Sequence, residues 1–224
     1  MGHNVRAVLD NIRQAALRAG RRPEAVRLIA ATKTVSPDSV LSAIAAGVRI
    51  LGESRLQEAL PKIEAIGAHE GLEWHFIGRL QRRKVKSVVG RFRLIHSVDS
   101  LDLAAEIDRR AAEAGIVQAV LMEVNIGDEA SKGGLAPAAV AEAVAAIKDL
   151  PNVSVRGLMA VPPPSTDPEA ARPYFRRLRE LALSLLPQGL QELSMGMSQD
   201  YAVAVEEGAT MVRVGTAIFG ARHG

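Results

Sequence analysis

Short apolar runs rich in β-branched residues alternate along this chain with segments whose apolar residues recur at helical spacing. Apolar residues at every second position are typical of strands, whereas recurrence at three and four positions is typical of helices with one buried face. The alternation of the two patterns indicates βαβ units on a parallel sheet. Eight runs are predicted to be strands, namely residues 28–33, 49–53, 74–78, 94–98, 119–125, 153–161, 192–198 and 211–219.

The segments between these runs carry the start and stop signals of helices. Ser36 precedes Pro37 and Asp38, which is the order of an N-cap followed by a proline in the first turn. Glycines fall where several of the predicted helices should end. Pro61 is an exception because it lies inside an apolar stripe that continues to Ile66, so we expect a break or kink of the helix there.

The number and spacing of the strands predict an α/β fold, a single (β/α)8 barrel of the TIM type. An open, doubly wound sheet is the alternative, but no Gly-x-Gly-x-x-Gly motif follows the first strand. No shift in composition marks a linker or a second domain, so residues 1–224 are expected to form one domain. We expect no eighth outer helix after the last strand. An extra N-terminal helix is expected to cover the gap between strands eight and one with Val5, Val8, Leu9, Ile12 and Ala16.

The composition restricts the class of protein. Of 224 residues, 48% are hydrophobic and 24% are charged, and 28 Lys and Arg against 25 Asp and Glu give a net charge of +3, as in an ordinary globular chain. Because the chain has no Cys, disulfides, thiolate metal sites and a Cys nucleophile are excluded. Neither a signal peptide nor a long apolar run is present, so we expect a cytoplasmic protein with no membrane contact.

A basic stretch is the main candidate for a nucleic-acid contact. It consists of Arg79, Arg82, Arg83, Lys84, Lys86, Arg91 and Arg93. With four Phe, two Tyr and one Trp, the chain has few aromatic side chains that can stack on bases. We therefore interpret the stretch as a solvated helix face and do not expect a nucleic-acid partner.

Two histidines lie on neighbouring predicted strands. His75 belongs to the third strand and His96 to the fourth. No third ligand lies at a suitable spacing for zinc, so no metal site is predicted.

The first candidate for chemistry is a lysine at the C-terminal end of the first strand, the end where barrel enzymes carry their functional groups. Alternation places Lys33 on the same face as Ile29 and Ala31. One interpretation is a rim lysine that is solvated or paired with an acid. The other is a lysine in an apolar mouth, where desolvation favours the neutral amine that forms a Schiff base. The spacing alone leaves both interpretations open.

The second candidate is formed by the last two strands and their loops. Many barrels bind phosphate after strands seven and eight, through backbone N–H groups and hydroxyls. Ser198, Gly215 and Thr216 have this chemistry. The alternative is that the glycines of this region only permit tight packing.

Seven segments, in order along the chain, carry a resemblance to a known family. They are residues 31–34 (ATKT), 52–58 (GESRLQE), 74–81 (WHFIGRLQ), 96–100 (HSVDS), 157–159 (GLM), 193–200 (LSMGMSQD) and 212–220 (VRVGTAIFG). Together they resemble the pyridoxal phosphate homeostasis proteins over almost the whole chain. Seven matches in order are far more specific than any one of them.

The resemblance implies a barrel of PLP fold type III, related to the N-terminal domain of alanine racemases and holding pyridoxal 5′-phosphate (PLP). Lys33 matches the lysine that forms the internal aldimine with PLP. Ser198, Gly215 and Thr216 match phosphate contacts, and Arg213 matches the arginine that faces the pyridine nitrogen. A permanently charged guanidinium disfavours protonation of that nitrogen, and an unprotonated ring is a weaker electron sink.

Two positions depart from the pattern of the family. Ser54 stands where Gly-Glu is usually followed by Asn, and Arg83 stands where the family usually has a second Asn. Ser54 keeps a hydrogen-bonding group with a shorter reach, and it remains a candidate for cofactor binding. The resemblance assigns no role to Arg83.

The function that the resemblance implies is the carrying and buffering of PLP in intracellular PLP homeostasis, without catalytic turnover and with no catalytic residue assigned. Apo-enzymes that depend on PLP are the expected recipients, and a monomer is expected.

The first alternative is a PLP-dependent amino-acid racemase. Related racemases draw a catalytic Tyr from a second, all-β domain, and this chain ends before such a domain begins; a low racemase activity stays open. The second alternative is a basic module that binds phosphate or RNA.

Overall fold

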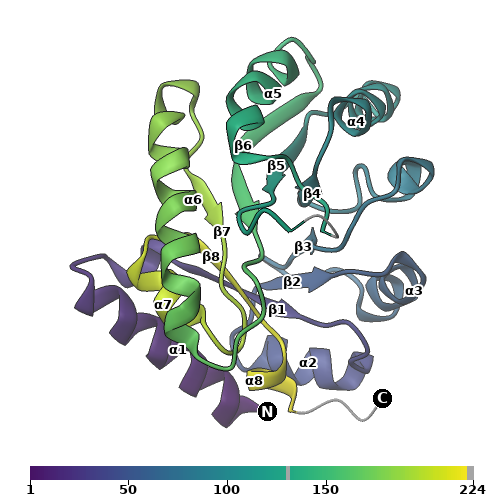
Figure 1. The fold of residues 1–224 in the computed structure, drawn as a ribbon. Coiled ribbons are helices and arrows are strands. Elements are labelled where there is room, and N and C mark those ends of the chain that lie inside the picture. Colours follow the sequence, from purple (N-terminus) through teal and green to yellow (C-terminus); the bar gives the residue numbers. More distant parts are fainter. Residues whose placement is uncertain (130–131, 221–224) are drawn as a thin grey trace.

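The predicted strands close into a barrel. The structure is a computed structural model that describes residues 1–129 and 132–220. Its strands run parallel, follow one another round the barrel in chain order, and close where β8 pairs with β1 (Figure 1). The strands are β1 (Arg27–Ala31), β2 (Ile50–Glu53), β3 (Glu73–Phe76), β4 (Leu94–Val98), β5 (Gln118–Val124), β6 (Val153–Ala160), β7 (Glu192–Ser194) and β8 (Met211–Val214). The predicted (β/α)8 architecture is confirmed.

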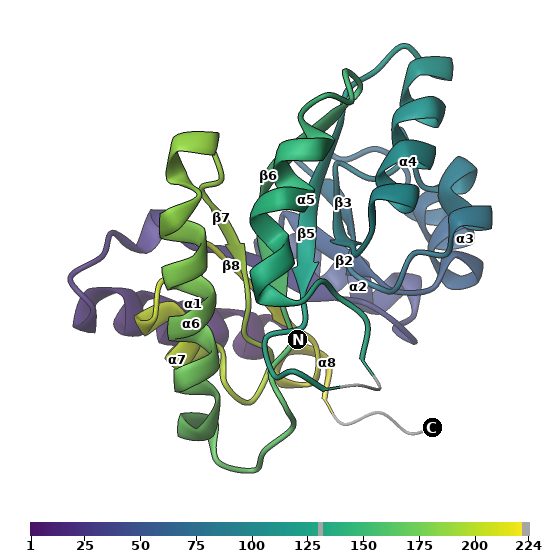
Figure 2. The same ribbon diagram turned by 45° about the horizontal axis from the view of Figure 1, so that its top comes forward.

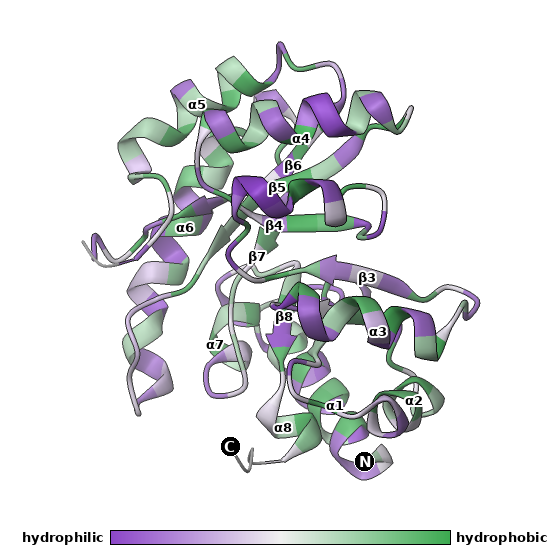
Figure 3. Cartoon of the chain, turned by 90° about the vertical axis from the view of Figure 1, so that its right-hand side faces the viewer, coloured by the Kyte–Doolittle hydropathy of each residue, from purple (hydrophilic) through white to green (hydrophobic). Residues whose placement is uncertain are grey.

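Helices surround the barrel on the outside (Figure 1 and Figure 2). The α-helices are α1 (Gly2–Arg18), α2 (Pro37–Ala45), α3 (Leu56–Ile66), α4 (Leu101–Glu113), α5 (Val140–Ile147), α6 (Arg172–Ser184), α7 (Tyr201–Glu206) and α8 (Thr216–Phe219). Short 3₁₀ helices span Pro23–Ala25, Arg82–Ser87, Pro137–Ala139, Pro168–Ala171 and Leu186–Gln188. Hydrophobic and hydrophilic positions alternate along the outer helices, as Figure 3 shows. None of the helices in the described part of the chain has the length and apolarity that a bilayer span requires.

Two apolar layers follow from the alternation of side chains along each strand. Side chains that point inward form a small cluster made of Ile29, Ile50, Leu94, Leu121, Met159 and Met211. Side chains that point outward pack against the helices and form the larger core, in which Leu51, Ile95 and Leu158 are fully buried. The barrel interior is therefore apolar except where the polar side chains described below enter it.

Three boundaries differ from the sequence prediction. The run predicted over 211–219 ends as a strand at Val214, and Thr216–Phe219 forms the short helix α8, so the expectation of no helix after the last strand was wrong. Strand β7 ends at Ser194 instead of continuing to 198. Strand β1 ends at Ala31, so Lys33 lies in the turn that follows the strand.

Pro61 does not break helix α3, which continues through it from Leu56 to Ile66. The proline removes one backbone donor, which would have paired with the carbonyl of Gln57. Both Pro61 and Gln57 are on the exposed face of the helix, where solvent can reach that carbonyl. The helix therefore keeps its buried face against the barrel.

The N-terminal helix α1 lies on the outside of the barrel and packs against α7, α8 and α2, which flank β8 and β1. Val5, Val8, Ile12 and Ala16 are buried, as the apolar stripe predicts. Leu9 is the exception, because it remains 39% exposed.

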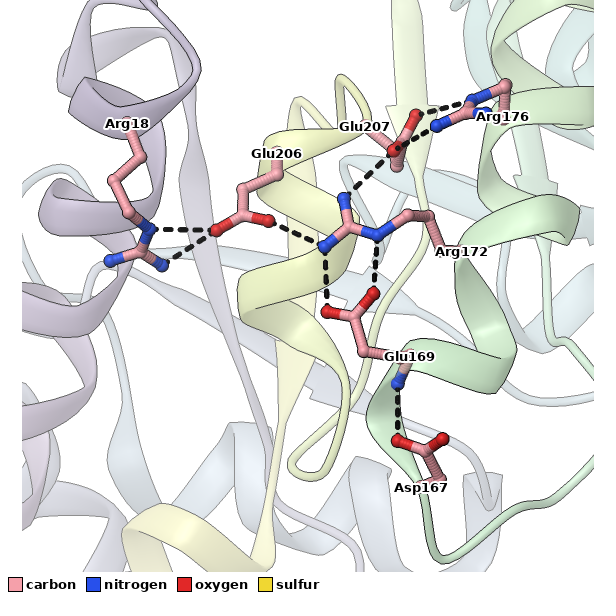
Figure 4. A network of polar contacts seen from close by, with 7 residues as sticks. All are labelled: Arg18, Asp167, Glu169, Arg172, Arg176, Glu206 and Glu207. Carbon is pink, nitrogen blue, oxygen red and sulfur yellow. Dashed lines mark hydrogen bonds and ion pairs between the residues drawn. The ribbon is translucent and has the colours of Figure 1, made fainter.

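A network of ion pairs ties α1 to α7 and α6 (Figure 4). Glu206 of α7 accepts hydrogen bonds from Arg18 of α1 and from Arg172 of α6. The neighbouring Glu207 pairs with Arg172 at 2.9 Å and with Arg176 at 3.1 Å. Exposed pairs contribute up to about 1 kcal/mol each. Their main effect is to fix α1 against the part of the barrel that carries β8.

Candidate functional site

A cavity of about 380 Å³ opens at the C-terminal ends of the strands. All six residues predicted to bind the cofactor line it, namely Lys33, Ser54, Ser198, Arg213, Gly215 and Thr216. The remaining wall includes Ala31, Gly52, Ile77, Met197, Asp200 and the prolines of the loop after β6. The structure thus brings together residues that are almost 200 positions apart in the sequence, at the end of the barrel that the strand directions predict.

Lys33 is positioned by a buried cluster on the outer side of β1 and β2. Lys62 of α3 donates from Nζ to the backbone carbonyl of Thr32 at 2.7 Å. The Thr32 hydroxyl donates to Oε1 of Glu53 at 2.7 Å, and Lys62 forms an ion pair with the same oxygen. The residue immediately before Lys33 is therefore held through both its carbonyl and its hydroxyl.

The cluster is isolated from water. The side chain of Glu53 is 0% exposed and that of Lys62 is 6% exposed. Among the described residues, Oε2 of Glu53 has no hydrogen-bond partner. The ion pair is the main compensation for burying this carboxylate, because an unpaired buried charge is costly.

The residue after Lys33 is also fixed. Thr34 has a φ of 62°, a left-handed conformation that a β-branched residue rarely adopts. Its backbone N–H donates to Oε2 of Glu58 at 2.7 Å, and this hydrogen bond is the main cause that lowers the pKa of Glu58. Held on both sides, the Lys33 backbone turns out of β1 into the cavity wall.

Arg213 enters the barrel interior from β8 and is 6% exposed. Its Nη1 donates to the carbonyl and the hydroxyl of Ser194, and its Nη2 donates to the carbonyl of Ala160 at 3.0 Å. A guanidinium has five N–H groups. Three are used by these acceptors within the described part of the chain, so two remain for a ligand in the cavity.

The charge of Arg213 survives its burial. Desolvation lowers the pKa of Arg213 to about 10, which still leaves it protonated at neutral pH. The carboxylates of Glu123 and Asp200 oppose this decrease. Burial in turn raises the pKa values of both carboxyl groups. The cavity therefore has a fixed positive charge at its base with acidic groups near it.

Ser198 joins the loops after β7 and β8. Its Oγ accepts hydrogen bonds from the backbone N–H groups of Gly215 at 3.1 Å and of Ala217 at 3.4 Å. Thr216, between them, is exposed to the cavity. Hydroxyls and backbone N–H groups gathered in this way are suited to a phosphate.

The two positions that depart from the family pattern lie in different surroundings. Ser54 lines the cavity, and its backbone approaches Gly78 so closely that a Cβ at position 78 would lie 2.3 Å from the Ser54 carbonyl oxygen. Arg83 is exposed and donates to Oε1 of Gln81, outside the cavity wall. The rest of the basic stretch lies mostly on the exposed surface, in agreement with a solvated face.

His75 and His96, which the sequence analysis considered only as metal ligands, meet inside the barrel. Nδ1 of His75 lies 3.1 Å from Nε2 of His96, and Nδ1 of His96 lies 2.9 Å from Oγ of Ser194. Nε2 of His75 lies 3.3 Å from a carboxylate oxygen of Glu73. Burial lowers the pKa of His75 to about 4 and lowers that of His96 well below its usual range, so both are neutral at pH 7.

Sequence reasoning missed these contacts and the cluster around Glu53. The signal for the histidines was alternation, because His75 and His96 both fall at inward positions of predicted strands. The signal for Glu53 was a carboxylate at the end of an otherwise apolar strand, with Lys62 on the facing helix. Neither signal states which strand or helix supplies the partner.

Known proteins resemble this chain over nearly its full length. The family described as "Alanine racemase, N-terminal domain" matches residues 4–223. The pyridoxal phosphate homeostasis protein of Aquifex aeolicus is 50% identical over 96% of this chain and 95% of its own length. The protein of the same name from Pseudomonas aeruginosa is 45% identical over 99% of this chain and 96% of its own length.

Solved structures agree with this similarity. A protein of unknown function from Bifidobacterium adolescentis has a TM-score of 0.91 and 40% identity, covering 97% of this chain and 94% of that chain. PipY of Synechococcus elongatus with PLP bound has a TM-score of 0.82 and 38% identity, covering 94% of this chain and 99% of that chain. Alanine racemase of Clostridium difficile has a TM-score of 0.74 and 16% identity, covering 99% of this chain and 58% of that chain, a likeness in fold alone.

The buried pair of Glu53 and Lys62 predicts a large effect of one substitution. Lys62→Met leaves the Glu53 carboxylate buried without its cation, so the free energy of unfolding should fall by about 3–5 kcal/mol. Urea unfolding measures this loss. In the exposed pair of Arg55 and Glu58, whose side chains are 63% and 28% exposed, Arg55→Met should cost less than about 1 kcal/mol. Equal losses for the two variants would contradict the role of the buried pair.

Proposed function

This chain belongs to the pyridoxal phosphate homeostasis proteins of the alanine racemase N-terminal domain family, and from this membership we propose that it binds PLP and carries and buffers the cofactor without catalytic turnover. The observation that carries the proposal is one cavity lined by both Lys33 and Arg213. Lys33 lies in the turn after β1, and Arg213 lies on the neighbouring strand β8, in which it pairs with Ile29 of β1.

The chemistry of the cavity fits PLP group by group. Lys33 supplies an amine for the aldehyde, and Arg213 supplies N–H donors for the pyridine nitrogen. For the phosphate, Ser198 and Thr216 would supply hydroxyls beside the backbone of Gly215, whose N–H is donated to Oγ of Ser198 in this structure. When bound, PLP would supply an electrophilic aldehyde and an aromatic ring that withdraws electrons. The cavity volume of about 380 Å³ lies in the usual range for small-molecule sites.

Arg213 is compatible with a carrier, although related racemases work with an arginine at this place and the arginine alone does not separate the two functions. A guanidinium only donates hydrogen bonds, so a ring nitrogen that faces it must accept and therefore be unprotonated. Carbanion chemistry on PLP gains most from a protonated ring. This arrangement supports binding of the cofactor with little activation of it.

The racemase alternative has weaker support. Relatives that are 45–50% identical over 95–96% of their own length are named as homeostasis proteins. The likeness to alanine racemase is limited to the fold. We further propose that the protein acts as a cytoplasmic monomer and that PLP-dependent apo-enzymes receive the cofactor.

Borohydride reduction tests the attachment site. Reduction of the PLP-loaded protein should fix the cofactor on Lys33, and peptide mapping identifies the modified residue. Lys33→Ala should abolish the visible absorption band of bound PLP, whereas Lys84→Ala, at a lysine outside the cavity, should retain it. Recovery of the label on Lys84 or Lys132 in the unmodified protein would reject Lys33.

The phosphate cradle predicts a loss that depends on the phosphate. Thr216→Val removes one hydroxyl, so PLP binding should weaken by about 1.5–3 kcal/mol, the range for a hydrogen bond to a charged group. Binding of pyridoxal, which lacks the phosphate, should not change. Titration followed by absorbance measures both affinities, with Thr166→Val at an exposed threonine outside the cavity as the control. Equal losses for PLP and pyridoxal would place the cradle elsewhere.

Proton exchange tests the absence of turnover. The PLP-loaded protein should exchange the α-proton of L-alanine in deuterated water far more slowly than the roughly 1 s⁻¹ of an ordinary enzyme. NMR measures the exchange, and Lys33→Ala with the same amount of PLP gives the contribution of free cofactor. Exchange at about 1 s⁻¹ or faster, with racemisation, would favour the racemase instead.

A further inference from the structure

A continuous line of polar side chains leads away from Arg213 through the barrel interior, buried as far as His75 and ending at Glu73, whose side chain is 40% exposed. It passes from Arg213 of β8 to Ser194 of β7, then to His96 of β4, His75 of β3 and finally Glu73 at the start of β3. Ser194, His96 and His75 are between 0% and 1% exposed. Side chains this deeply buried need hydrogen-bond partners, so the contacts among them must pair donors with acceptors.

The arginine end sets only the first of these hydrogen bonds. Arg213 has no acceptor, so it donates to the Ser194 oxygen. That oxygen has a second lone pair, so Ser194 could either accept from Nδ1 of His96 or donate to it, and the direction is decided at the other end of the line.

The carboxylate end decides the direction. The Glu73 carboxylate only accepts, so Nε2 of His75 must carry the proton that it receives. A neutral His75 then accepts at Nδ1 from Nε2–H of His96, and a neutral His96 accepts at Nδ1 from the Ser194 hydroxyl. The carboxylate therefore selects one tautomer for each neutral histidine, and the low pKa values of both rings agree with neutral imidazoles.

We propose that Ser194, His96, His75 and Glu73 form a one-directional chain of positioning residues that holds the Arg213 guanidinium toward the ring nitrogen of a bound cofactor. The identity of that ligand rests on the function proposed above. The chain locks the rotation of the Ser194 hydroxyl and aims its lone pairs at Nη1 of Arg213. Together with the carbonyls of Ser194 and Ala160, it defines the plane of the guanidinium.

The hydrogen-bonded line from Arg213 to Glu73 also links the two ends of the barrel. Glu73 and His75 line a second cavity, of about 330 Å³, together with Arg27, Arg93, Arg156 and Glu192. Arg27 forms an ion pair with Glu192 there, and Arg93 lies 4.0 Å from Glu73. A change at Glu73 therefore reaches Arg213 through three intervening side chains, without any contact with the cofactor cavity.

The tautomers can be measured in the unmodified protein without cofactor. Long-range ¹H–¹⁵N NMR spectra at neutral pH should show both His75 and His96 as neutral rings with the proton on Nε2. An Nδ1 proton or a charged ring at either histidine would contradict the proposed direction of the hydrogen bonds from Ser194 to Glu73. This measurement needs no substitution and does not depend on PLP binding.

The effect on Arg213 can be measured with ¹⁵N-labelled PLP. Ser194→Ala should move the ring-nitrogen signal and raise the dissociation constant of PLP about fivefold, as the loss of one hydrogen bond predicts. Ser97→Ala is the matched control, because it removes another buried hydroxyl. That hydroxyl donates to the carbonyl of Gly78 and does not belong to the hydrogen-bonded line from Arg213 to Glu73. The same signal and affinity for both variants would overturn the proposal.

Substitution at the far end separates positioning from local packing. Glu73→Leu removes the terminal acceptor and should move the ring-nitrogen signal, whereas Glu73→Gln keeps an accepting oxygen and should preserve the signal. An unchanged signal in Glu73→Leu would overturn the link between the two ends. If the unmodified protein binds no PLP, the proposed function fails, whereas PLP binding that is insensitive to Ser194 and Glu73 defeats this inference alone.

Discussion

A permanently charged guanidinium inside a closed, otherwise apolar barrel is the constraint from which much of the interior follows. Removing Arg213 from water is costly, and the cost is tolerable only where its N–H groups meet acceptors. The carbonyls of Ala160 and Ser194 supply two of them, because β6 and β7 end beside the arginine. The Ser194 hydroxyl supplies the third, and it needs a partner of its own. The polar interior is thus a consequence of one buried charge.

The register of the barrel strands determines how Lys33 and Arg213 come to line the same cavity. Because Ile29 and Arg213 are paired across β1 and β8, both side chains point inward. Lys33 follows in the turn after β1 and lines the same cavity as Arg213. A slip of one residue between these strands would turn Arg213 outward, toward the helices. On the other side of the sheet, the ion pair of Glu53 and Lys62 holds the end of β1 through Thr32. Two buried ionic groups on opposite faces of the sheet therefore fix the geometry of one cavity.

The sequence was sufficient for the barrel, which follows from local periodicity, whereas the position of Lys33 in the cavity wall also depends on the turn that begins after Ala31. The sequence was insufficient for contacts between side chains that lie far apart in the chain. His96 and Ser194 are 98 positions apart, and nothing in either segment specifies the other. The same applies to Lys62, whose partner Glu53 lies on a strand instead of its own helix.

The break expected at Pro61 did not occur because a proline on the solvated face of a helix removes one replaceable hydrogen bond. Residues 216–219 were apolar enough to continue a strand, yet the chain turns at Gly215 into α8.

The direction of the hydrogen bonds around Arg213 bears on why a family that shares the racemase fold is suited to carrying PLP. In the proposed hydrogen-bonded line, every proton from Ser194 to Glu73 is donated away from the arginine. If the ring nitrogen of PLP faces Arg213 as proposed, protonating that nitrogen would set a donor against a donor, because a guanidinium has no acceptor. An unprotonated ring still forms a covalent bond with an amine, since that step depends on the aldehyde and on Lys33. It stabilises a carbanion poorly. If PLP binds as proposed, this arrangement would favour attachment of the cofactor with little activation of it.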